Sequence, residues 1–192
     1  MKKIILASGS PRRRELLGLL GRKFEVKVSH CQEVITQTDP AMVTMELARQ
    51  KAEAVAAGMG KDGIVLGADT VVSIEGEILG KPADKREAEK MISKIQGKSH
   101  EVYTGVAFLV VEKGKILQTK TLAEKTQVEV ASMTPDEIQH YIQGQEPYDK
   151  AGGYGIQGEF ARFVSRIHGD YNNVVGLPVH RVYEALKELG EF

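Results

Sequence analysis

The sequence predicts an α/β fold built on a mixed, partly antiparallel sheet that is flanked by helices. Three observations carry this prediction. Helix and strand signals alternate near both ends of the chain, and a long β section lies between them, broken only by Lys113-Gly114. The chain has 192 residues, of which 42% are hydrophobic, so it can form one domain or two closely joined lobes.

Strands are predicted where β-branched and apolar residues run together or alternate with polar ones. Such runs are separated by turn signals, of which Glu75-Gly76-Glu77 is the clearest. It predicts a tight turn into a short return strand. The other predicted strands cover residues 2–7, 24–28, 64–74, 102–108, 115–130 and 160–166.

Helix starts are predicted from N-cap residues. Ser10-Pro11, Asp39-Pro40 and Thr134-Pro135 each join a capping side chain to a first-turn proline, and the first of these helices extends through Leu20. Asp84 with Glu87 resembles a capping box. A last helix begins at Pro178, after a glycine-rich loop over 144–158. Apolar stripes at helical spacing follow two of the starts: Val43, Leu47 and Ala54, and Ala88, Met91, Ile92 and Ile95.

Composition excludes several classes of protein. Lys plus Arg and Asp plus Glu both number 26, so the net charge is zero and a general attraction to nucleic acid or to membranes is not expected. The single cysteine, Cys31, cannot form an internal disulfide, which favours a reducing compartment. The apolar run Ile4 to Ala7 is too short for a signal peptide, and no apolar stretch is long enough to span a membrane. We expect a cytoplasmic protein.

Basic residues at the first helix start indicate an anion site. Arg12, Arg13 and Arg14 stand where the helix dipole disfavours cations, by about 0.3–1 kcal/mol each when exposed. A phosphate bound there, approached closely by the backbone of residues 8–10, would remove that penalty. Solvated arginines, or pairing with Glu15, would explain the run equally well.

Asp69 interrupts the apolar strand over 64–74, which is unusual because a buried carboxylate needs a partner. A metal ion or a lysine could be that partner; a strand-end aspartate in water, or a structural ion pair, is the alternative. Lys81, in Gly80-Lys81-Pro82, lacks the spacing of a P-loop but remains a candidate phosphate-binding cation.

Residues 153–158 match the dinucleotide pattern G-x-G-x-x-G, but no strand precedes them and a strand-like run follows, so the match is weak. Gln157 within it could read a base edge, although a solvated glutamine is the commoner case. The five histidines show no spacing typical of a metal site.

Several of these segments together resemble the Maf family of nucleoside triphosphate pyrophosphatases, which are structurally akin to the inosine-triphosphate pyrophosphatases. The similarity covers nearly the whole chain and implies a single domain over 1–192 with a cleft between two lobes. It rests on the order and spacing of Ser8-x-Ser10-Pro11-Arg12-Arg13, Lys51-Ala52, Gly67-Ala68-Asp69-Thr70-Val71-Val72, Gly80-Lys81-Pro82, His100-x-Val102-Tyr103-Thr104-Gly105-Val106, Asp149-Lys150-Ala151-Gly152, Gly155-Ile156-Gln157-Gly158 and Asn173-Val174-Val175-Gly176-Leu177-Pro178.

The resemblance implies cleavage between the α and β phosphates with a divalent metal such as Mg²⁺, Mn²⁺ or Co²⁺. Asp69 matches the catalytic proton acceptor, and Glu33 matches an acidic position that, with Asp69, holds the metal. Gln32 stands where the family often has aspartate, so Glu33 carries more of any metal binding. The other implied roles are active-site cations at Lys51 and Lys81, a phosphate loop at Ser8, Ser10 and Arg13, and base choice at Arg12, Thr70 and Gln157.

The base-choice residues resemble the branch that acts on dTTP and UTP rather than on 7-methyl-GTP. The family is associated with cleansing of nucleotide pools, and its name records an effect on septum formation. Two alternatives stay open: a nucleotide- or nucleic-acid-binding regulator of cell division without catalysis, and a phosphohydrolase that removes only the γ-phosphate. A homodimer is expected from base rates alone.

Overall fold

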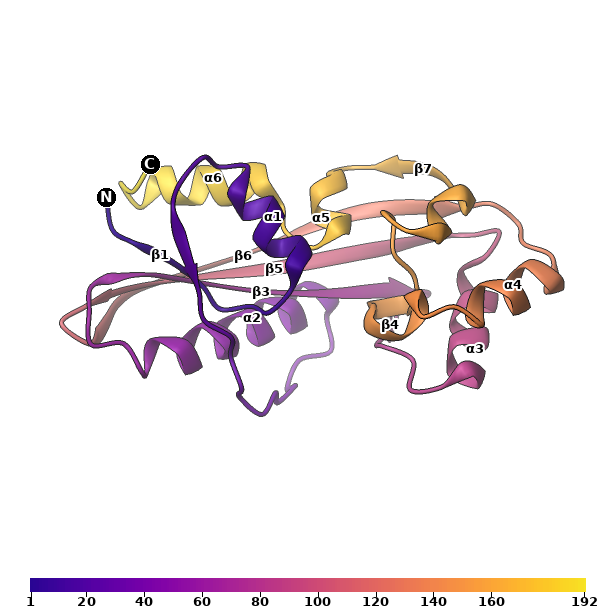
Figure 1. The fold of residues 1–192 in the computed structure, drawn as a ribbon, viewed down its shortest axis with the longest axis horizontal. Helices are drawn as coiled ribbons and strands as arrows, with labels where there is room; N and C mark the ends of the chain where they lie inside the picture. The colour runs from indigo at the N-terminus through magenta and orange to yellow at the C-terminus, as the bar shows by residue number, and fades with distance from the viewer. The chain divides into compact units, whose positions relative to one another are not determined.

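The computed structural model describes all residues from Met1 to Phe192 and has the predicted α/β fold (Figure 1). Seven strands form one mixed sheet in the order β2-β1-β3-β5-β6-β7, and β4 pairs with β3. The chain divides into two compact units. Unit 1 comprises Met1–Asp69, Thr104–Glu124 and Gly176–Phe192; unit 2 comprises Thr70–Tyr103 and Lys125–Val175. The long strands β3 (Gly63–Ile74), β5 (Ser99–Glu112) and β6 (Lys115–Val130) contribute residues to both.

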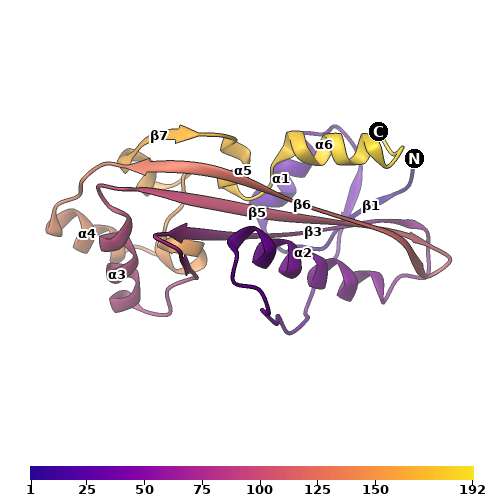
Figure 2. The ribbon, with the colours of Figure 1, turned by 180° about the vertical axis from the view of Figure 1, so that it is seen from behind.

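In unit 1, β1 (Ile4–Leu6) lies between two parallel neighbours, β2 (Phe24–Val26) and β3. Helix α2 (Pro40–Ala56) buries Ala48, Ala52 and Val55 against side chains of β1, β3 and β5. Figures 1 and 2 show α1 (Pro11–Gly18) and α6 (Val179–Glu188) on the other side of these strands from α2. Because successive side chains of a strand point to opposite faces of the sheet, helices on both sides can cover all of them.

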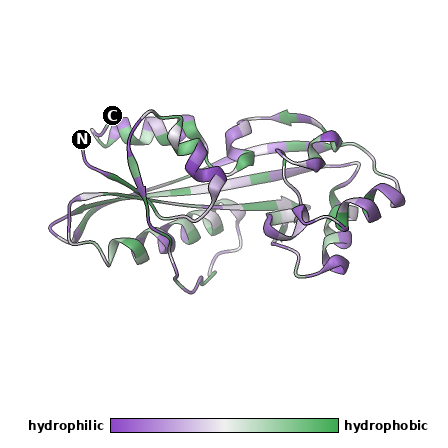
Figure 3. Cartoon of the chain, viewed as in Figure 1, coloured by the Kyte–Doolittle hydropathy of each residue, from purple (hydrophilic) through white to green (hydrophobic).

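Two glycines let α2 approach the sheet closely. A Cβ atom on Gly67 of β3 would lie 2.1 Å from the carbonyl oxygen of Ala48, and one on Gly105 of β5 would lie 2.3 Å from the carbonyl carbon of Thr44. Any side chain at either position would push the helix away, because both obstacles are backbone atoms. Along α2 and α6, hydrophobic and hydrophilic residues alternate in Figure 3, as amphipathic helices on a sheet require.

Unit 2 has its own core around β4 (Glu77–Leu79), α3 (Lys85–Ile95), α4 (Pro135–Ile142) and β7 (Val164–His168). The predicted stripe of α3 is confirmed, since Ala88, Ile92 and Ile95 are fully buried and Met91 packs beside them. In the same core the ring of Phe160 makes tilted contacts with the rings of Tyr141 and Tyr154, at centroid distances of 5.1 and 4.7 Å.

The predicted helix starts are confirmed by the caps. Ser10, Asp39, Asp84 and Thr134 each accept a hydrogen bond from the backbone N–H three residues later. Thr134 also forms the full capping box with Glu137. The turn at Lys113-Gly114 and the strand over 115–130 lie where the sequence places them.

Other sequence predictions were wrong. Residues Glu159–Phe163 form a 3-10 helix, not the start of a strand, because the N–H groups of Glu159 and Phe160 donate to the Glu146 carboxylate and cannot join a sheet. The strand β7 begins only at Val164. A short helix, α5 (Tyr171–Val175), was not predicted, and the first helix ends at Gly18.

In the predicted stripe of α2, Val43 and Leu47 are buried as expected, but Ala54 is exposed. The buried face of the helix is centred on Ala48, Ala52 and Val55, so Ala54 lies beyond its edge. Cys31 is half-buried in the segment before α2, where its sulfur accepts a hydrogen bond from the Ser29 hydroxyl, so it is not a core residue. No helix of the structure has the length and hydrophobicity that crossing a membrane demands.

Candidate active site

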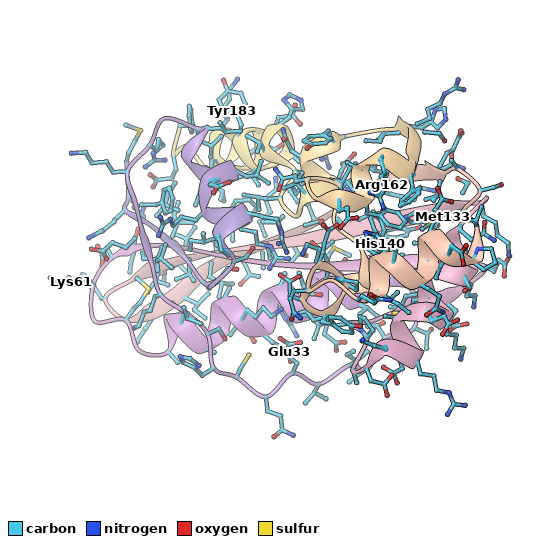
Figure 4. The ribbon with its side chains drawn as sticks, turned by 45° about the vertical axis from the view of Figure 1, so that its right-hand side comes forward. Glu33, Lys61, Met133, His140, Arg162 and Tyr183 are labelled. Atoms are coloured by element: carbon cyan, nitrogen blue, oxygen red, sulfur yellow. The ribbon has the colours of Figure 1, made fainter.

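Three predicted site residues of unit 1 meet at one ammonium group. Lys51 Nζ contacts the carboxylate of Asp69 and lies 3.1 Å from Oε1 of Glu33. The Lys51 and Asp69 side chains are only 17% and 15% exposed, whereas that of Glu33 is 46% exposed. Glu33 stands on the segment that leads into α2 (Figure 4). Of the two partners considered for Asp69, a metal ion or a lysine, the lysine is therefore present.

The sequence Gly67-Ala68-Asp69 explains this meeting. Alternate residues of a strand share a face, so Asp69 lies on the same face of β3 as Gly67. The missing side chain of Gly67 brings β3 against Ala48 and Ala52, which flank Lys51 on α2. Asp69 therefore faces the helix that carries Lys51, whereas the next residue, Thr70, is directed to the other face.

The loop before α1 is arranged by its serines. Ser8 Oγ accepts a hydrogen bond from the Ser10 amide (3.2 Å), and Ser10 Oγ accepts one from the Arg13 amide (3.4 Å). A hydroxyl that accepts in this way keeps its own O–H available as a donor. The loop thus offers two fixed hydroxyl donors beside the positive end of α1, an arrangement suited to a phosphate.

Burial lowers the pKa of the Arg13 guanidinium below its usual value. The negative charges of Asp69 and Glu33 oppose this shift, whereas the positive charge of Arg12 adds to it. Arg13 Nε donates to the carbonyl oxygen of Gly176 (2.9 Å), which orients the group. An anion near Arg12 and Arg13 would relieve their mutual repulsion, so the electrostatics of this end of α1 favour a negatively charged ligand.

The remaining predicted residues lie in unit 2. Thr70 is half-buried, and Lys81 and Gln157 are exposed. The turn before Lys81 is tied to the glycine-rich loop, because the Gly152 amide donates to the carbonyl oxygen of Gly80 (2.9 Å). Gly152 has φ +70° and packs on Val72, only two residues beyond Thr70. These contacts hold the loops that carry Lys81 and Gln157 onto β3.

Sequence reasoning missed two polar arrangements in unit 2. The Glu146 carboxylate accepts three backbone N–H groups from residues 155–160, although nothing in its local sequence signals this. His100, buried in the sheet, lies 2.6 Å from the hydroxyl of Tyr154 through Nε2 and leaves Nδ1 without a partner. Burial lowers the pKa of His100 to about 4 and raises that of Tyr154.

The structure contains no group of three or more His, Cys, Asp or Glu side chains that could hold a metal ion. The metal ligands expected from the resemblance are two carboxylates, Glu33 and Asp69, and both face the Lys51 ammonium. Mg²⁺ at phosphate sites usually takes only one or two protein carboxylates, so a third is not required.

The fold places the protein among known α/β proteins. It is similar to the structure of a HAM1 protein from Coxiella burnetii, with a TM-score of 0.57 over 98% of this chain and 100% of that one. The two sequences are 16% identical, so this likeness concerns the fold alone. The strand order and this likeness in fold confirm the predicted mixed sheet.

The sequence identifies the family. The family model described as Maf-like protein matches residues 3–189, and this chain belongs to that family. A dTTP/UTP pyrophosphatase of Agathobacter rectalis is 49% identical, with 99% of this chain and 98% of that protein covered. A dTTP/UTP pyrophosphatase of Bacillus cereus (strain ATCC 10987 / NRS 248) is 52% identical, with 98% and 90% covered. One of Bacillus anthracis is 51% identical, with 98% and 96% covered.

Proposed function

We propose that this chain hydrolyses dTTP and UTP to the nucleoside monophosphate and pyrophosphate. The observation that carries the proposal is the partly buried contact of Asp69 and Glu33 with Lys51, in a unit that also presents Ser8, Ser10 and Arg13. Relatives of about 50% identity that carry the name dTTP/UTP pyrophosphatase support the substrate class. Because the family model spans both units, we also propose that residues 1–192 work as one domain.

Binding of the triphosphate falls to the cations and hydroxyls. Phosphoryl transfer depends mainly on positioning and on neutralising charge, and the substrate carries about four negative charges. Ser8 and Ser10 donate O–H groups to phosphate oxygens, and Arg13 supplies a cation already oriented by Gly176. Lys51 and Lys81 stabilise the charge that develops on the departing pyrophosphate.

Asp69 accepts the proton of the attacking water. Its carboxylate is largely removed from bulk solvent, and the Lys51 ammonium holds it in place. A general base must lie within hydrogen-bonding reach of the water that it activates, so this fixed position is the useful feature of the pair. Attack on the α-phosphorus then releases pyrophosphate, whereas attack on the γ-phosphorus would release orthophosphate.

A divalent cation fits the donor set. The carboxylates of Glu33 and Asp69 both contact the Lys51 ammonium, so their oxygens lie close to one another. Such hard oxygen ligands suit Mg²⁺, Mn²⁺ or Co²⁺. When bound there, the cation would neutralise phosphate charge as a Lewis acid. Gln32 contributes no charge, so Glu33 is the main acidic ligand of its segment.

Base choice is assigned to Arg12, Thr70 and Gln157. A uracil or thymine edge presents carbonyl oxygens and an imide N–H, which the Gln157 amide can pair and Arg12 can supplement. A site built to bond such groups rejects a base that leaves them unpaired.

The decisive experiment is product analysis. The purified chain is incubated with Mg²⁺, Mn²⁺ or Co²⁺ and with dTTP, UTP, CTP, ATP, GTP or 7-methyl-GTP, and the phosphorus products are identified. Pyrophosphate with dTMP or UMP is the expected result. Release of orthophosphate alone would show that the chain removes the γ-phosphate instead. Release of pyrophosphate only from nucleotides with other bases would overturn the assignment of dTTP and UTP as substrates. No turnover with any combination of metal and nucleotide would favour a nucleotide-binding regulator.

A further inference from the structure

Gln157 stands in a β-turn that is closed by its own backbone. The Gly158 amide donates to the carbonyl oxygen of Gly155 (3.2 Å), so Ile156 and Gln157 are the two central residues of the turn. Ile156 is buried, whereas Gln157 is exposed. The turn therefore projects one amide side chain from a fixed base.

One carboxylate holds both ends of this turn. Glu146 Oε1 accepts hydrogen bonds from the amides of Gly155 and Phe160 (both 3.3 Å), and Oε2 accepts one from the amide of Glu159 (2.6 Å). The Tyr141 hydroxyl donates to Oε1 as a fourth contact (3.1 Å). Glu146 thus binds the residue that opens the turn and the two residues that follow it.

The close approach of this carboxylate accounts for the glycines. A Cβ atom on Gly158 would lie 2.1 Å from Glu146 Oε2, and one on Gly155 would lie 2.6 Å from the Cε of Lys150. Lys150 itself donates through Nζ to the carbonyl oxygen of Glu146 (3.1 Å). Space for Lys150 and Glu146 therefore explains two of the three glycines of the motif, Gly155 and Gly158.

Hydrogen bonds from N–H groups to an ionised acceptor are stronger than neutral ones, so the turn is held more firmly than its own single hydrogen bond would allow. A side chain presented from a fixed backbone loses less freedom when it binds its ligand. Base choice by Gln157 needs such a fixed origin, because amide pairing to a base edge is directional.

We propose that Glu146 is a positioning residue for pyrimidine recognition, its carboxylate fixing the 155–158 turn so that the Gln157 amide meets the base. This inference rests on the proposed function and adds to it the residue that organises base choice. Glu146 acts through Gln157 and is not itself a ligand of the nucleotide.

The test compares the ratio of kcat/KM for UTP to kcat/KM for CTP. The two bases differ at C4, which carries a carbonyl in uracil and an amino group in cytosine, and at N3, which carries a hydrogen only in uracil. Glu146→Gln keeps the size of the side chain but turns one acceptor into a donor that faces an N–H group. We expect this variant and Gln157→Ala each to lower the ratio about tenfold or more. Glu159→Gln is the matched control. It removes a carboxylate of the same loop that pairs with Arg162 and His140, and it should keep the ratio within about twofold. Figure 4 labels Arg162 and His140.

The double variant separates positioning from general destabilisation. If Glu146 acts through Gln157, Glu146→Gln in the Gln157→Ala background lowers the ratio no further, within about twofold. Multiplied losses in the double variant would overturn the inference. So would a wild-type ratio in a Glu146→Gln protein that keeps its circular dichroism spectrum, or a loss at Glu146 without one at Gln157.

Gly158→Ala tests the same contact if Glu146→Gln does not fold. Gly158 has φ −107°, which alanine adopts freely, so the collision with the carboxylate is the expected consequence. We expect the same fall in the ratio, with Gly60→Ala unchanged because open space surrounds Gly60. A Gly158→Ala protein with the wild-type ratio would overturn the inference. Failure of wild type to release pyrophosphate would instead overturn the proposed function itself.

Discussion

The ammonium group of Lys51 contacts the carboxylate of Asp69 across 18 positions of the chain, joining α2 to β3. The same ammonium lies 3.1 Å from Glu33, so one cation holds two carboxylates that would otherwise repel each other. This relationship ties the predicted base, the predicted metal ligand and a predicted cation into one cluster, and it makes the role of each separately testable.

Replacing Asp69 with asparagine should abolish turnover but preserve nucleotide binding. Asparagine keeps the size and one carbonyl oxygen, whereas it cannot accept a proton from water. We expect kcat to fall about 10²–10⁴-fold. Pyrophosphate release gives kcat, and calorimetric titration with a slowly hydrolysed analogue gives affinity. Asp62→Asn is the control, because the side-chain oxygen of asparagine can still accept the hydrogen bond from the Lys113 amide there. Near-normal kcat in Asp69→Asn would reject the assignment.

Lys51→Met should destabilise the fold and weaken substrate binding together. It leaves the largely buried Asp69 carboxylate without its cation, which we expect to cost about 1–3 kcal/mol in the free energy of unfolding. Urea denaturation measures this cost. The exposed Lys90→Met on α3 should be neutral. In the Asp69→Asn background the cost of Lys51→Met should shrink, and an unchanged cost would show that the two side chains are not coupled.

Acid should destabilise unit 2 through His100. Burial lowers its pKa to about 4 in the folded state, below the ordinary value of 6.5, so unfolding takes up a proton between these pH values. The stabilising effect is complete above pH about 6.5 and is lost as the pH falls toward 4, by at most about 1.4 kcal/mol per pH unit. His100→Asn should flatten the decline of stability between pH 7 and 5. Parallel curves for variant and wild type would contradict this.

Gly152→Ala should destabilise the loop that carries Gln157. Its φ of +70° disfavours alanine, and a Cβ there would lie 2.9 Å from a methyl group of Val72. We expect a loss of about 1–3 kcal/mol in the free energy of unfolding. Gly60→Ala, where nothing lies within 4 Å, is the matched control. Equal midpoints of denaturation for the two variants would show that the loop accommodates the side chain.

Some helices and strands could be predicted from the sequence and others could not. Cap residues act over three or four positions, so the starts at Ser10, Asp39 and Thr134 could be predicted correctly. The strand over 115–130 was also predictable from its length and its Lys113-Gly114 turn. The structure of the run after Gly158 was not predictable, because the amides of Glu159 and Phe160 bond to Glu146, thirteen and fourteen residues earlier.

The sequence by itself determined the α/β class, the helix starts and the family, since these depend on local patterns and on the order of motifs. It also singled out Asp69 as a carboxylate in need of a partner. Only the tertiary structure decided that the partner is Lys51, through the approach of α2 to Gly67, and that Glu146 holds the Gln157 turn. Contacts between residues far apart in the chain depend on packing, which no local pattern records.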